Sequence, residues 1–216
     1  MFFEYGQQRP EHFKEDWEGQ FSIIPWMSYL TSIPHPVYMV TTLNPDGKAN
    51  AGLLGWSAFN GAGDDYCVLM PTYRGGHTHR NIQRDGEFCI NFVTEDYVQQ
   101  IKKSIAINQE GVDEIEGSGF SKEPSHVIKA PRIKESYLRL ECKLEWERDL
   151  YEGSNLVVVC AKAVHISVDS DYATRQMDDR YEDSILLHMM PMIDPRNGER
   201  IQGGIGRAKP TQKINL

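Results

Sequence analysis

The pattern of hydrophobic and polar residues along the chain predicts a protein built mainly from β-strands. Between residues 137 and 146, apolar side chains alternate with charged ones at a period of two, which is typical of a half-buried strand. Residues 156–168 form a longer and more continuous apolar run, which predicts a strand buried on both faces. Shorter apolar runs at residues 65–71 and 87–93 predict two further strands.

The strongest local prediction is a β-hairpin. Residues 36–43 and 48–59 are rich in β-branched and aromatic side chains, and they flank the tetrapeptide Asn44-Pro45-Asp46-Gly47. Proline presets φ at the second position of a turn, and aspartate and glycine tolerate the conformations that follow. The tetrapeptide therefore predicts a tight turn between two antiparallel strands.

Helical patterns are fewer than strand patterns. Residues 97–107 carry apolar side chains at helical spacing, which predicts an amphipathic helix. A second helix is expected to start at Thr78, a good N-cap residue, and to end at Asp85-Gly86. The charged residues 171–183 predict a third helix.

Six or so strands joined by hairpins, with few helices, predict a closed or nearly closed antiparallel barrel. The polar, glycine-rich residues 108–120 are expected to leave the core. No linker rich in Pro, Gly or Ser divides the chain, so residues 1–216 are expected to form a single domain with an N-terminal extension of about residues 1–32. The tail of about residues 191–216 is expected to wrap the surface or a partner subunit.

Composition narrows the class of protein. The chain of 216 residues is 40% hydrophobic and 25% charged, which is enough apolar material for a core. Its net charge is −8 and it shows no basic stripe, so nucleic acid is not expected as a partner. No apolar run is long enough for a membrane helix, and the start lacks the basic and apolar segments of a signal peptide.

The four cysteines point to a reducing compartment. Cys67, Cys89, Cys142 and Cys160 all lie in apolar runs, and none forms a Cys-x-x-Cys pair. They are predicted to be buried thiols, and the protein is predicted to be cytoplasmic.

The segment with the clearest chemistry is Arg74-Gly75-Gly76-His77-Thr78, before the second predicted helix. Glycine allows close approach of a ligand, and a helix N-terminus offers N–H groups at the positive end of the dipole. The Arg74 guanidinium and the Thr78 hydroxyl add donors, so the segment predicts a phosphate site. A capped surface helix with chance basic residues is an equally good interpretation of this segment alone.

Other candidate sites are weaker. His77 and His79 could bind a metal ion, but no third ligand lies close in sequence, so no metal site is predicted. The Gly-rich residues 203–208 lack the spacing and the following helix of a dinucleotide fingerprint. Any nicotinamide cofactor is therefore expected to bind as a transient co-substrate.

Six short motifs, in the same order over about residues 33–168, resemble the flavin reductase-like, FMN-binding split-barrel family, and most of all its flavoredoxin-like branch. The segments that carry the resemblance are Pro36-Val37-Tyr38-Met39-Val40-Thr41-Thr42 with Asp46-Gly47, Asn50-Ala51, Thr78-x-x-Asn81-Ile82, Gly86-Glu87-Phe88 to Asn91, Ala130-Pro131-Arg132-Ile133, and Glu135-Ser136 with Leu140-Glu141-Cys142.

The resemblance implies a mainly β fold, an antiparallel Greek-key split β-barrel with a few peripheral helices, in a homodimer that holds FMN near the dimer interface. The flavin contacts that it implies are Thr41 and Thr42 beside the isoalloxazine, Asn50, Ala51, Gly55, Trp56 and Ser57 at the ring edge, Arg74, His77 and Thr78 at the phosphate, and Asn81 in support of that loop. Trp56 could instead be a core aromatic, and the two threonines ordinary strand residues.

The implied activity is an oxidoreductase. Electrons would pass from NADH, NADPH or a redox partner protein through bound FMN to a flavin or another small acceptor. No side-chain acid or base is strictly required, so no catalytic residue is predicted.

One departure from the family pattern bears on the electron donor. Many NAD(P)H:flavin reductases that the chain resembles carry Gly-Asp-His after the strand that here ends near Leu150, and this chain has Gly153-Ser154-Asn155. His126 or His165 could replace the missing imidazole in space. Two alternatives therefore stay open: a flavoredoxin-type electron carrier without direct NAD(P)H activity, and a cofactor-free barrel that binds another phosphorylated small molecule.

Overall fold

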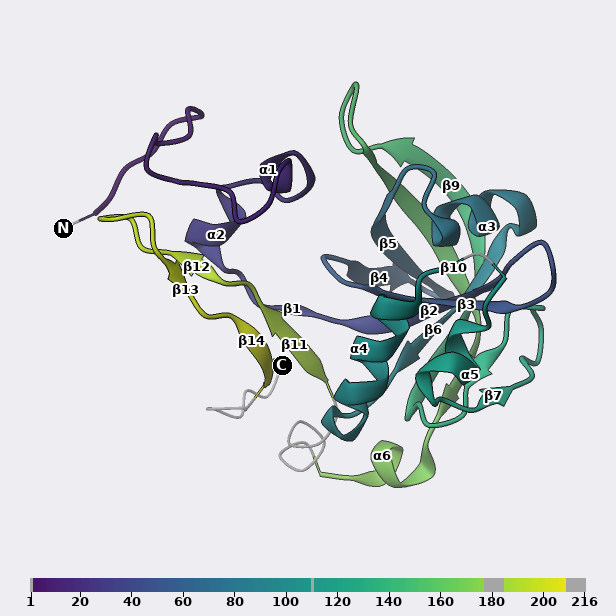
Figure 1. The fold of residues 1–216 in the computed structure, drawn as a ribbon. Coiled ribbons are helices and arrows are strands. Elements are labelled where there is room, and N and C mark those ends of the chain that lie inside the picture. Colours follow the sequence, from purple (N-terminus) through teal and green to yellow (C-terminus); the bar gives the residue numbers. More distant parts are fainter. Residues whose placement is uncertain (1, 110, 177–184, 209–216) are drawn as a thin grey trace. The chain divides into compact units, whose positions relative to one another are not determined.

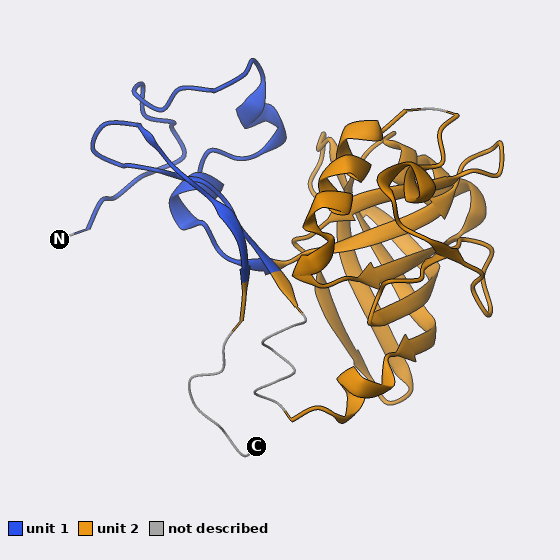
Figure 2. Ribbon diagram, turned by 60° about the horizontal axis from the view of Figure 1, so that its bottom comes forward, with its two compact units in different colours: residues 1–35, 187–206 blue, residues 36–186, 207–216 orange. Residues whose placement is uncertain are grey.

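The computed structural model describes residues 2–109, 111–176 and 185–208, and these residues fall into two compact units (Figures 1 and 2). Unit 1 combines residues 1–35 with 187–206, and unit 2 combines residues 36–186 with 207–216. The prediction that the whole chain forms one domain stays a prediction.

Unit 2 is built on a seven-stranded antiparallel sheet with the strand order β3-β2-β6-β9-β10-β5-β4. Its strands are β2 (Tyr38–Leu43), β3 (Ala49–Leu54), β4 (Ala58–Ala62), β5 (Asp65–Tyr73), β6 (Glu87–Phe92), β9 (Leu138–Asp149) and β10 (Leu156–Val168). In the described part of the chain no ladder joins β3 to β4, so the sheet is open at these two strands. The predicted mainly β, antiparallel fold is confirmed.

The remaining elements of unit 2 are short or helical. They are α3 (His77–Asp85), η1 (Glu95–Tyr97), α4 (Val98–Ile107), α5 (Glu114–Ser118), α6 (Ser170–Thr174), and the paired strands β7 (Lys122–Glu123) and β8 (Arg132–Ile133). The helix predicted over residues 171–183 is observed as α6, which ends at Thr174. Residues 177–183 of that prediction lie outside the described residues.

Two apolar clusters lie on the two faces of β2. Tyr38 and Val40 join the main core cluster, to which β5, β6, β9, β10 and α3 also contribute. Met39, one residue along, joins a second cluster with Ile101 of α4 and Ile115 of α5. Alternation along the strand sends successive side chains to opposite faces, so the first face lines the main core and helices α4 and α5 contribute to the cluster on the second.

The predicted hairpin is confirmed, with Leu43 of β2 opposite Ala49 of β3. Its turn is closed by Asn44 N–H, which donates to Lys48 O at 2.8 Å, and Gly47 takes a φ of 81°, which favours glycine. The second strand ends at Leu54 and does not continue to Phe59 as expected, because Trp56 adopts a left-handed φ of 52° and breaks the extended backbone.

Three further expectations need correction. Residues 108–120 do not leave the core, because Ile115 and Phe120 are buried in the second cluster. Strand β10 is buried on both faces only in its first half, and Ile166 in its second half is exposed. In α4 the buried positions are Ile101 and the polar Ser104, whereas Ile105, one of the apolar residues at helical spacing from which the amphipathic helix was predicted, is exposed.

The cysteines follow their prediction in three of four cases. Cys89, Cys142 and Cys160 are buried, and burial raises the pKa of Cys89 to about 12. Cys67 is half-buried, contrary to expectation, because it lies near the start of β5 on an exposed part of the sheet.

Unit 1 brings the N-terminal extension and the C-terminal tail together. Phe13 and Tyr29 pack with Met190 and Ile193 in a separate apolar cluster. Its helices and its hairpin are α1 (Gln20–Ile23), α2 (Ser28–Thr31), β12 (Met192–Ile193) and β13 (Arg200–Ile201). A three-stranded sheet has the order β1 (His35–Pro36), β11 (Leu186–Met189) and β14 (Gly204–Arg207). Throughout the described ranges, no helix has the length and apolar character needed to cross a bilayer.

Candidate functional site

The loop between β5 and α3 is held in place by a buried histidine. Gly75 takes a φ of 74°, and its N–H donates to His79 Nδ1 at 2.9 Å. Because Nδ1 accepts this bond, the ring proton lies on Nε2, which faces Glu147 Oε2 at 3.3 Å. His79 therefore anchors the loop, which gives it a structural role that the sequence did not indicate.

The helix after this loop has its N-cap two residues earlier than predicted. Its N-cap is Gly76, and Thr78 lies inside the first turn, so the assignment of Thr78 as N-cap is wrong. Glycine has no side chain to cap the first N–H groups, and the positive end of the helix dipole is consequently left without a side-chain acceptor at this position.

Four of the residues predicted from the resemblance meet in one polar network between α3 and the β2–β3 hairpin. Thr42 Oγ1 accepts hydrogen bonds from Asn50 Nδ2 (3.1 Å) and from Asn81 Nδ2 (2.9 Å). Asn50 Nδ2 also donates to Thr78 Oγ1 at 3.0 Å, and Asn81 Nδ2 donates to Asn44 Oδ1 at 2.9 Å. The network is buried at Thr42, Asn50 and Asn81, so it fixes the helix against the hairpin.

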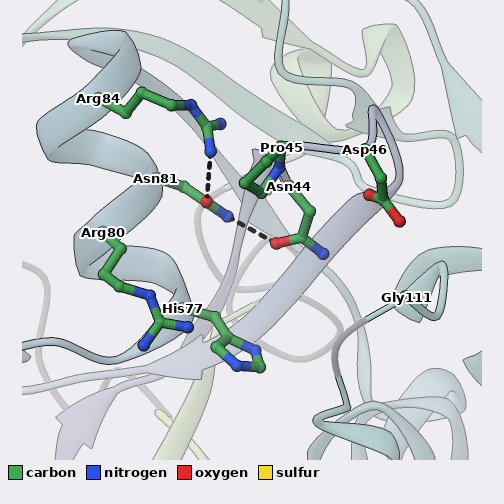
Figure 3. A pocket seen from close by; sticks show the side chains of 8 residues that line it. All are labelled: Asn44, Pro45, Asp46, His77, Arg80, Asn81, Arg84 and Gly111. Carbon is green, nitrogen blue, oxygen red and sulfur yellow. Dashed lines mark hydrogen bonds between the residues drawn. The ribbon is translucent and has the colours of Figure 1, made fainter.

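A pocket of about 400 Å³ lies beside this network, between α3 and the hairpin turn (Figure 3). Its lining residues are Asn44, Pro45, Asp46, His77, Arg80, Asn81, Arg84 and Gly111. His77, Arg80 and Arg84 follow one another at helical spacing, so a single face of α3 presents basic side chains to the pocket. Asp46 is the acidic residue of this lining.

Hydrogen bonds hold much of the lining in place. Arg84 donates from Nη1 to Asn81 Oδ1 at 3.2 Å and from Nη2 to the carbonyl of Leu43 at 2.5 Å. Arg80 Nη1 donates to the carbonyl of Gly75 at 2.6 Å. Asn44 Nδ2 is buried and has no hydrogen-bond acceptor among the described residues. The pocket thus offers basic groups and one unsatisfied amide donor.

Backbone groups at the free edge of β3 are bound by side chains from α4 and α5. Ala51 N–H donates to Glu114 Oε2 at 2.7 Å, and Ser104 Oγ donates to the carbonyl of Ala51 at 2.5 Å. Ala49 N–H donates to Asp113 Oδ2 at 3.1 Å. These contacts protect an edge strand and fix the part of it that carries Asn50 and Ala51.

The other predicted site residues lie apart from this network. Thr41 is buried on the opposite face of β2 from Thr42, where its hydroxyl donates to the carbonyl of Pro131 at 2.5 Å. Arg74 does not line the pocket and forms an ion pair with Asp149 at 2.5 Å. Their predicted flavin contacts stay predictions.

The predicted ring-edge segment lies between β3 and β4. Ser57 Oγ donates to the carbonyl of Gly55 at 3.0 Å and also contacts the Tyr38 hydroxyl. Trp56 is 54% exposed, so it is not the core aromatic that the sequence left as an alternative. A non-glycine residue with positive φ is strained, and such strain is characteristic of functional sites.

Neither His126 nor His165 lies near the Gly153-Ser154-Asn155 loop. Asn155 is close to the start of α3, since its carbonyl accepts the N–H of Arg74 at 2.9 Å. His165, in β10, lies ten residues after Asn155, or about 33 Å away at the rise of a strand. The ring of His126 packs on that of His165 at 4.5 Å. Within one chain, therefore, neither imidazole replaces the one missing from this loop.

Sequence reasoning missed several residues that line or support the pocket. Arg80 and Arg84 could have been found, because their spacing from His77 places all three on one helix face. Asn44 was treated only as a turn residue. No local sequence pattern indicated a role for Glu114, because its contact with Ala51 joins residues 63 positions apart.

The chain belongs to the flavin reductase-like family. Residues 30–188, well over half of the chain, match the family described as flavin reductase like domain. A protein of Aquifex aeolicus (strain VF5) is 29% identical over 156 residues, which are 69% of this chain and 77% of that protein.

Solved structures share the fold. A protein with a split barrel domain from Shewanella frigidimarina NCIMB 400 superposes with a TM-score of 0.71 at 19% identity, over 88% of this chain and 90% of that one. Flavoredoxin from Methanosarcina acetivorans superposes with a TM-score of 0.66 at 22% identity, over 85% of this chain and 89% of that one. The predicted membership of the split-barrel flavin reductase-like family is confirmed.

The residues around the pocket fit the phosphate end of a flavin mononucleotide. A phosphate monoester carries between one and two negative charges near neutral pH and accepts several hydrogen bonds. The unsatisfied Asn44 amide, the basic face of α3 and the glycine-capped helix start supply what such a group needs. The volume of about 400 Å³ also lies in the range of small-molecule sites, about 300–1,000 Å³.

Proposed function

We propose that this member of the flavin reductase-like family is an oxidoreductase that binds FMN. It passes electrons from NADH, NADPH or a redox partner protein to a flavin or another small acceptor. The observation that carries the proposal is the pocket whose basic lining comes from one face of α3, next to the network of Thr42, Asn50, Thr78 and Asn81.

In this proposal, the residues divide between the two ends of the cofactor. His77, Arg80, Arg84 and Asn44 would hold the phosphate, with Asn81 keeping helix and hairpin together. Asn50, Ala51 and the exposed Trp56 would lie toward the ring. Arg74 stays a candidate for the phosphate, for which it would have to leave Asp149.

The chemistry that bound FMN supplies is hydride acceptance and the onward transfer of electrons one or two at a time. The task of the chain is to bind, orient and polarise. The buried contacts of Ala51 with Glu114 and Ser104 keep β3 rigid, and the basic face of α3 balances the phosphate charge. No side chain is assigned an acid or base role in this reaction.

A visible spectrum and a nicotinamide assay test the proposal. Protein incubated with FMN and gel-filtered should retain yellow flavin with quenched fluorescence. Mixing it with NADH or NADPH and free FMN should lower the absorbance at about 340 nm. A preparation that binds no FMN contradicts the proposal, and one that binds FMN without oxidising either nucleotide contradicts nicotinamide as the direct donor.

A second candidate function is an electron carrier that receives electrons from a protein and not from NAD(P)H. It is favoured by Asn155, which stands where the reductases resembled by this chain have histidine, and by the distance of His165 from that loop. The carrier predicts FMN that survives gel filtration, slow reduction by nicotinamides and fast reduction by a protein donor. Rapid turnover of free flavin with readily lost FMN contradicts it.

The proposal extends to the assembly and the location of the protein. We propose a homodimer with the flavin near the interface, in the cytoplasm, without nucleic acid or membrane as a partner. Sedimentation of the purified protein with and without FMN tests the dimer, and a monomer under both conditions contradicts it.

A further inference from the structure

The large sheet is open between β3 and β4, and a short segment spans the opening. The two strands lie at opposite ends of the strand order, and residues 55–57 carry the chain from one to the other. Within this segment Trp56 has a left-handed φ of 52° and a side chain that is 54% exposed. A non-glycine residue keeps such a conformation only where the surrounding structure holds it. The groups that contact the segment therefore decide where the tryptophan lies.

The buried residue next to this segment is Tyr38. It forms the last pair of the β2–β3 ladder, opposite Leu54, and the segment begins at the next residue, Gly55. Its ring packs on Phe59 of β4 with the ring centroids 5.5 Å apart, and on Phe92 with the centroids 5.2 Å apart. The side chain is 1% exposed, so packing on both sides fixes the position of its hydroxyl group.

Two hydrogen bonds lead from this hydroxyl group into the segment, and both have a defined direction. Ser57 Oγ donates its single hydrogen to the carbonyl of Gly55 at 3.0 Å, so it accepts from the Tyr38 hydroxyl. Burial raises the pKa of Tyr38, so its hydroxyl keeps the proton that it donates. The residues on either side of Trp56 are thus tied to one group of the core.

We propose that Tyr38 is a positioning residue for the flavin site, whose buried hydroxyl acts through Ser57 to hold Trp56 in place beside the flavin ring. The proposal rests on the proposed function, in which Trp56 lies toward the ring of FMN. A segment that is held before the ligand arrives does not have to be ordered when the ligand binds, which favours binding. The contribution of Tyr38 belongs to the ring end of the site and not to the phosphate end.

The test variant is Tyr38→Phe, which keeps the aromatic packing and removes only the hydroxyl group. Fluorescence titration measures the affinity for FMN and for riboflavin, which has the same ring and no phosphate. Because one hydrogen bond is lost at the ring end, we expect both affinities to fall by the same factor, about 3- to 10-fold. Arg80→Ala at the pocket should instead weaken FMN and leave riboflavin unchanged. If Tyr38→Phe weakens FMN alone, or neither flavin, the proposal is overturned.

The absorption spectrum of the bound flavin separates positioning from a loss of stability. At saturating FMN, the visible bands should be displaced from those of the wild type in Tyr38→Phe, because the surroundings of the ring have changed. They should stay in place in Arg80→Ala, which alters the phosphate end. Unchanged bands in Tyr38→Phe would contradict a role at the ring.

A second substitution tests whether Tyr38 acts through Ser57. In a Ser57→Ala background, Tyr38→Phe should change flavin affinity by less than about 2-fold, because the group that transmits its effect is already absent. If the full loss persists in that background, Tyr38 does not act through Ser57 and the assignment is wrong.

Tyr29→Phe is the matched control. Tyr29 is 3% exposed, and its hydroxyl accepts a hydrogen bond from Gln20 Nε2 at 2.8 Å in unit 1. Its variant loses a buried tyrosine hydroxyl of the same kind and should keep both flavin affinities within about 2-fold of the wild type. A loss equal to that of Tyr38→Phe would show that any such hydroxyl has this effect, and it would overturn the specific role of Tyr38.

A measurement without ligand distinguishes failure of this inference from failure of the proposed function. In NMR spectra of the flavin-free protein, the indole N–H signal of Trp56 is assigned by its loss in Trp56→Phe. It should move in Tyr38→Phe and in Ser57→Ala, and stay in place in Tyr29→Phe. If it does so and the wild type binds no FMN, the positioning role stands and the proposed function fails. If FMN binds and the signal does not move in Tyr38→Phe, the positioning role is contradicted.

Discussion

The two ends of β10 carry polar clusters of opposite kinds. Near Asn155, the pocket between α3 and the hairpin has three basic side chains, one acid and an amide donor without an acceptor. Near His165, Glu141 is fully buried and accepts the N–H groups of His126 (2.8 Å) and Val127 (2.7 Å). Arg132 lies 3.7 Å from the same carboxylate.

The difference between the two polar clusters indicates which of them binds a ligand. At the His165 end, the buried carboxylate of Glu141 meets N–H groups and Arg132 within the chain, as buried charges must if they are to serve the fold. At the Asn155 end, Arg84 is paired with Asp85 at 2.5 Å, but the buried Asn44 Nδ2 has no acceptor among the described residues, and an anion from outside would supply one. The comparison predicts that substitutions at one end change stability and those at the other change flavin affinity.

The largest effect is expected at the structural end. Glu141→Ala leaves two backbone N–H groups without their buried acceptor and removes one of the two carboxylates near Arg132, which keeps Glu123 at 3.1 Å. It should lower the free energy of unfolding by about 3–5 kcal/mol. Urea denaturation followed by fluorescence measures this, and the folded fraction should bind FMN with unchanged affinity. If Glu141→Ala is stable but binds FMN poorly, the flavin lies at the His165 end of β10, and our placement of the site beside α3 is wrong.

The next effect concerns two arginines at the pocket end. Arg80→Ala should weaken FMN binding by about 1.5–3 kcal/mol, because it removes a charged donor from the pocket, with little change in stability. Arg74→Ala is the variant for comparison, since Arg74 is the other candidate for the phosphate and is paired with Asp149 outside the lining. Titration of both variants with FMN compares them, and a larger loss for Arg74→Ala would show that the phosphate lies nearer the start of the loop.

Trp56 should show opposite effects on stability and binding. Trp56→Gly relieves a positive φ, so it should raise the free energy of unfolding by about 1 kcal/mol. It also removes an exposed aromatic ring, so FMN binding should weaken by about 1 kcal/mol if the ring stacks on the flavin. Thermal denaturation and FMN titration give the two values, and unchanged affinity would remove Trp56 from the site.

The smallest effects are opposite pH trends in stability at Asp113 and Glu114. Glu114 has a raised pKa, so its contribution to stability is lost as the pH rises above about 4.5, and Glu114→Gln should gain stability relative to the wild type in that direction. Asp113 has a lowered pKa, so its contribution is present above about 3.8 and is lost on further acidification. Asp113→Asn should therefore be less stable at pH 7, with the gap closing in acid. The urea midpoints of both variants at several pH values test these two trends. If the stabilities of the two variants change in the same direction with pH, the opposite pKa shifts of Asp113 and Glu114 are contradicted.

The sequence predicts the features that depend on neighbouring residues. The hairpin follows from its turn residues. The family resemblance named Thr42, Asn50, Thr78 and Asn81 as site residues, and the structure joins these four in one network. The start of α3 was misplaced because two glycines allow more than one N-cap.

Features that depend on packing could not be predicted in this way. Glu114 lies in a polar, glycine-rich segment that looks like a surface loop, and only the tertiary fold brings it to Ala51. Trp56 is an aromatic residue of the kind that is common in strands, but its positive φ ends the extended backbone of the predicted strand. The pairing of Arg74 with Asp149 likewise joins residues 75 positions apart, so no local pattern reveals it.

The central claim is that the pocket beside α3 binds the phosphate of FMN. The most direct measurement compares FMN with riboflavin, which has the same ring and no phosphate, by fluorescence titration of the wild-type protein. Because a charge-assisted phosphate contact contributes about 1.5–3 kcal/mol, the account predicts that FMN binds at least about 10-fold more tightly. Equal affinity for the two flavins would contradict it.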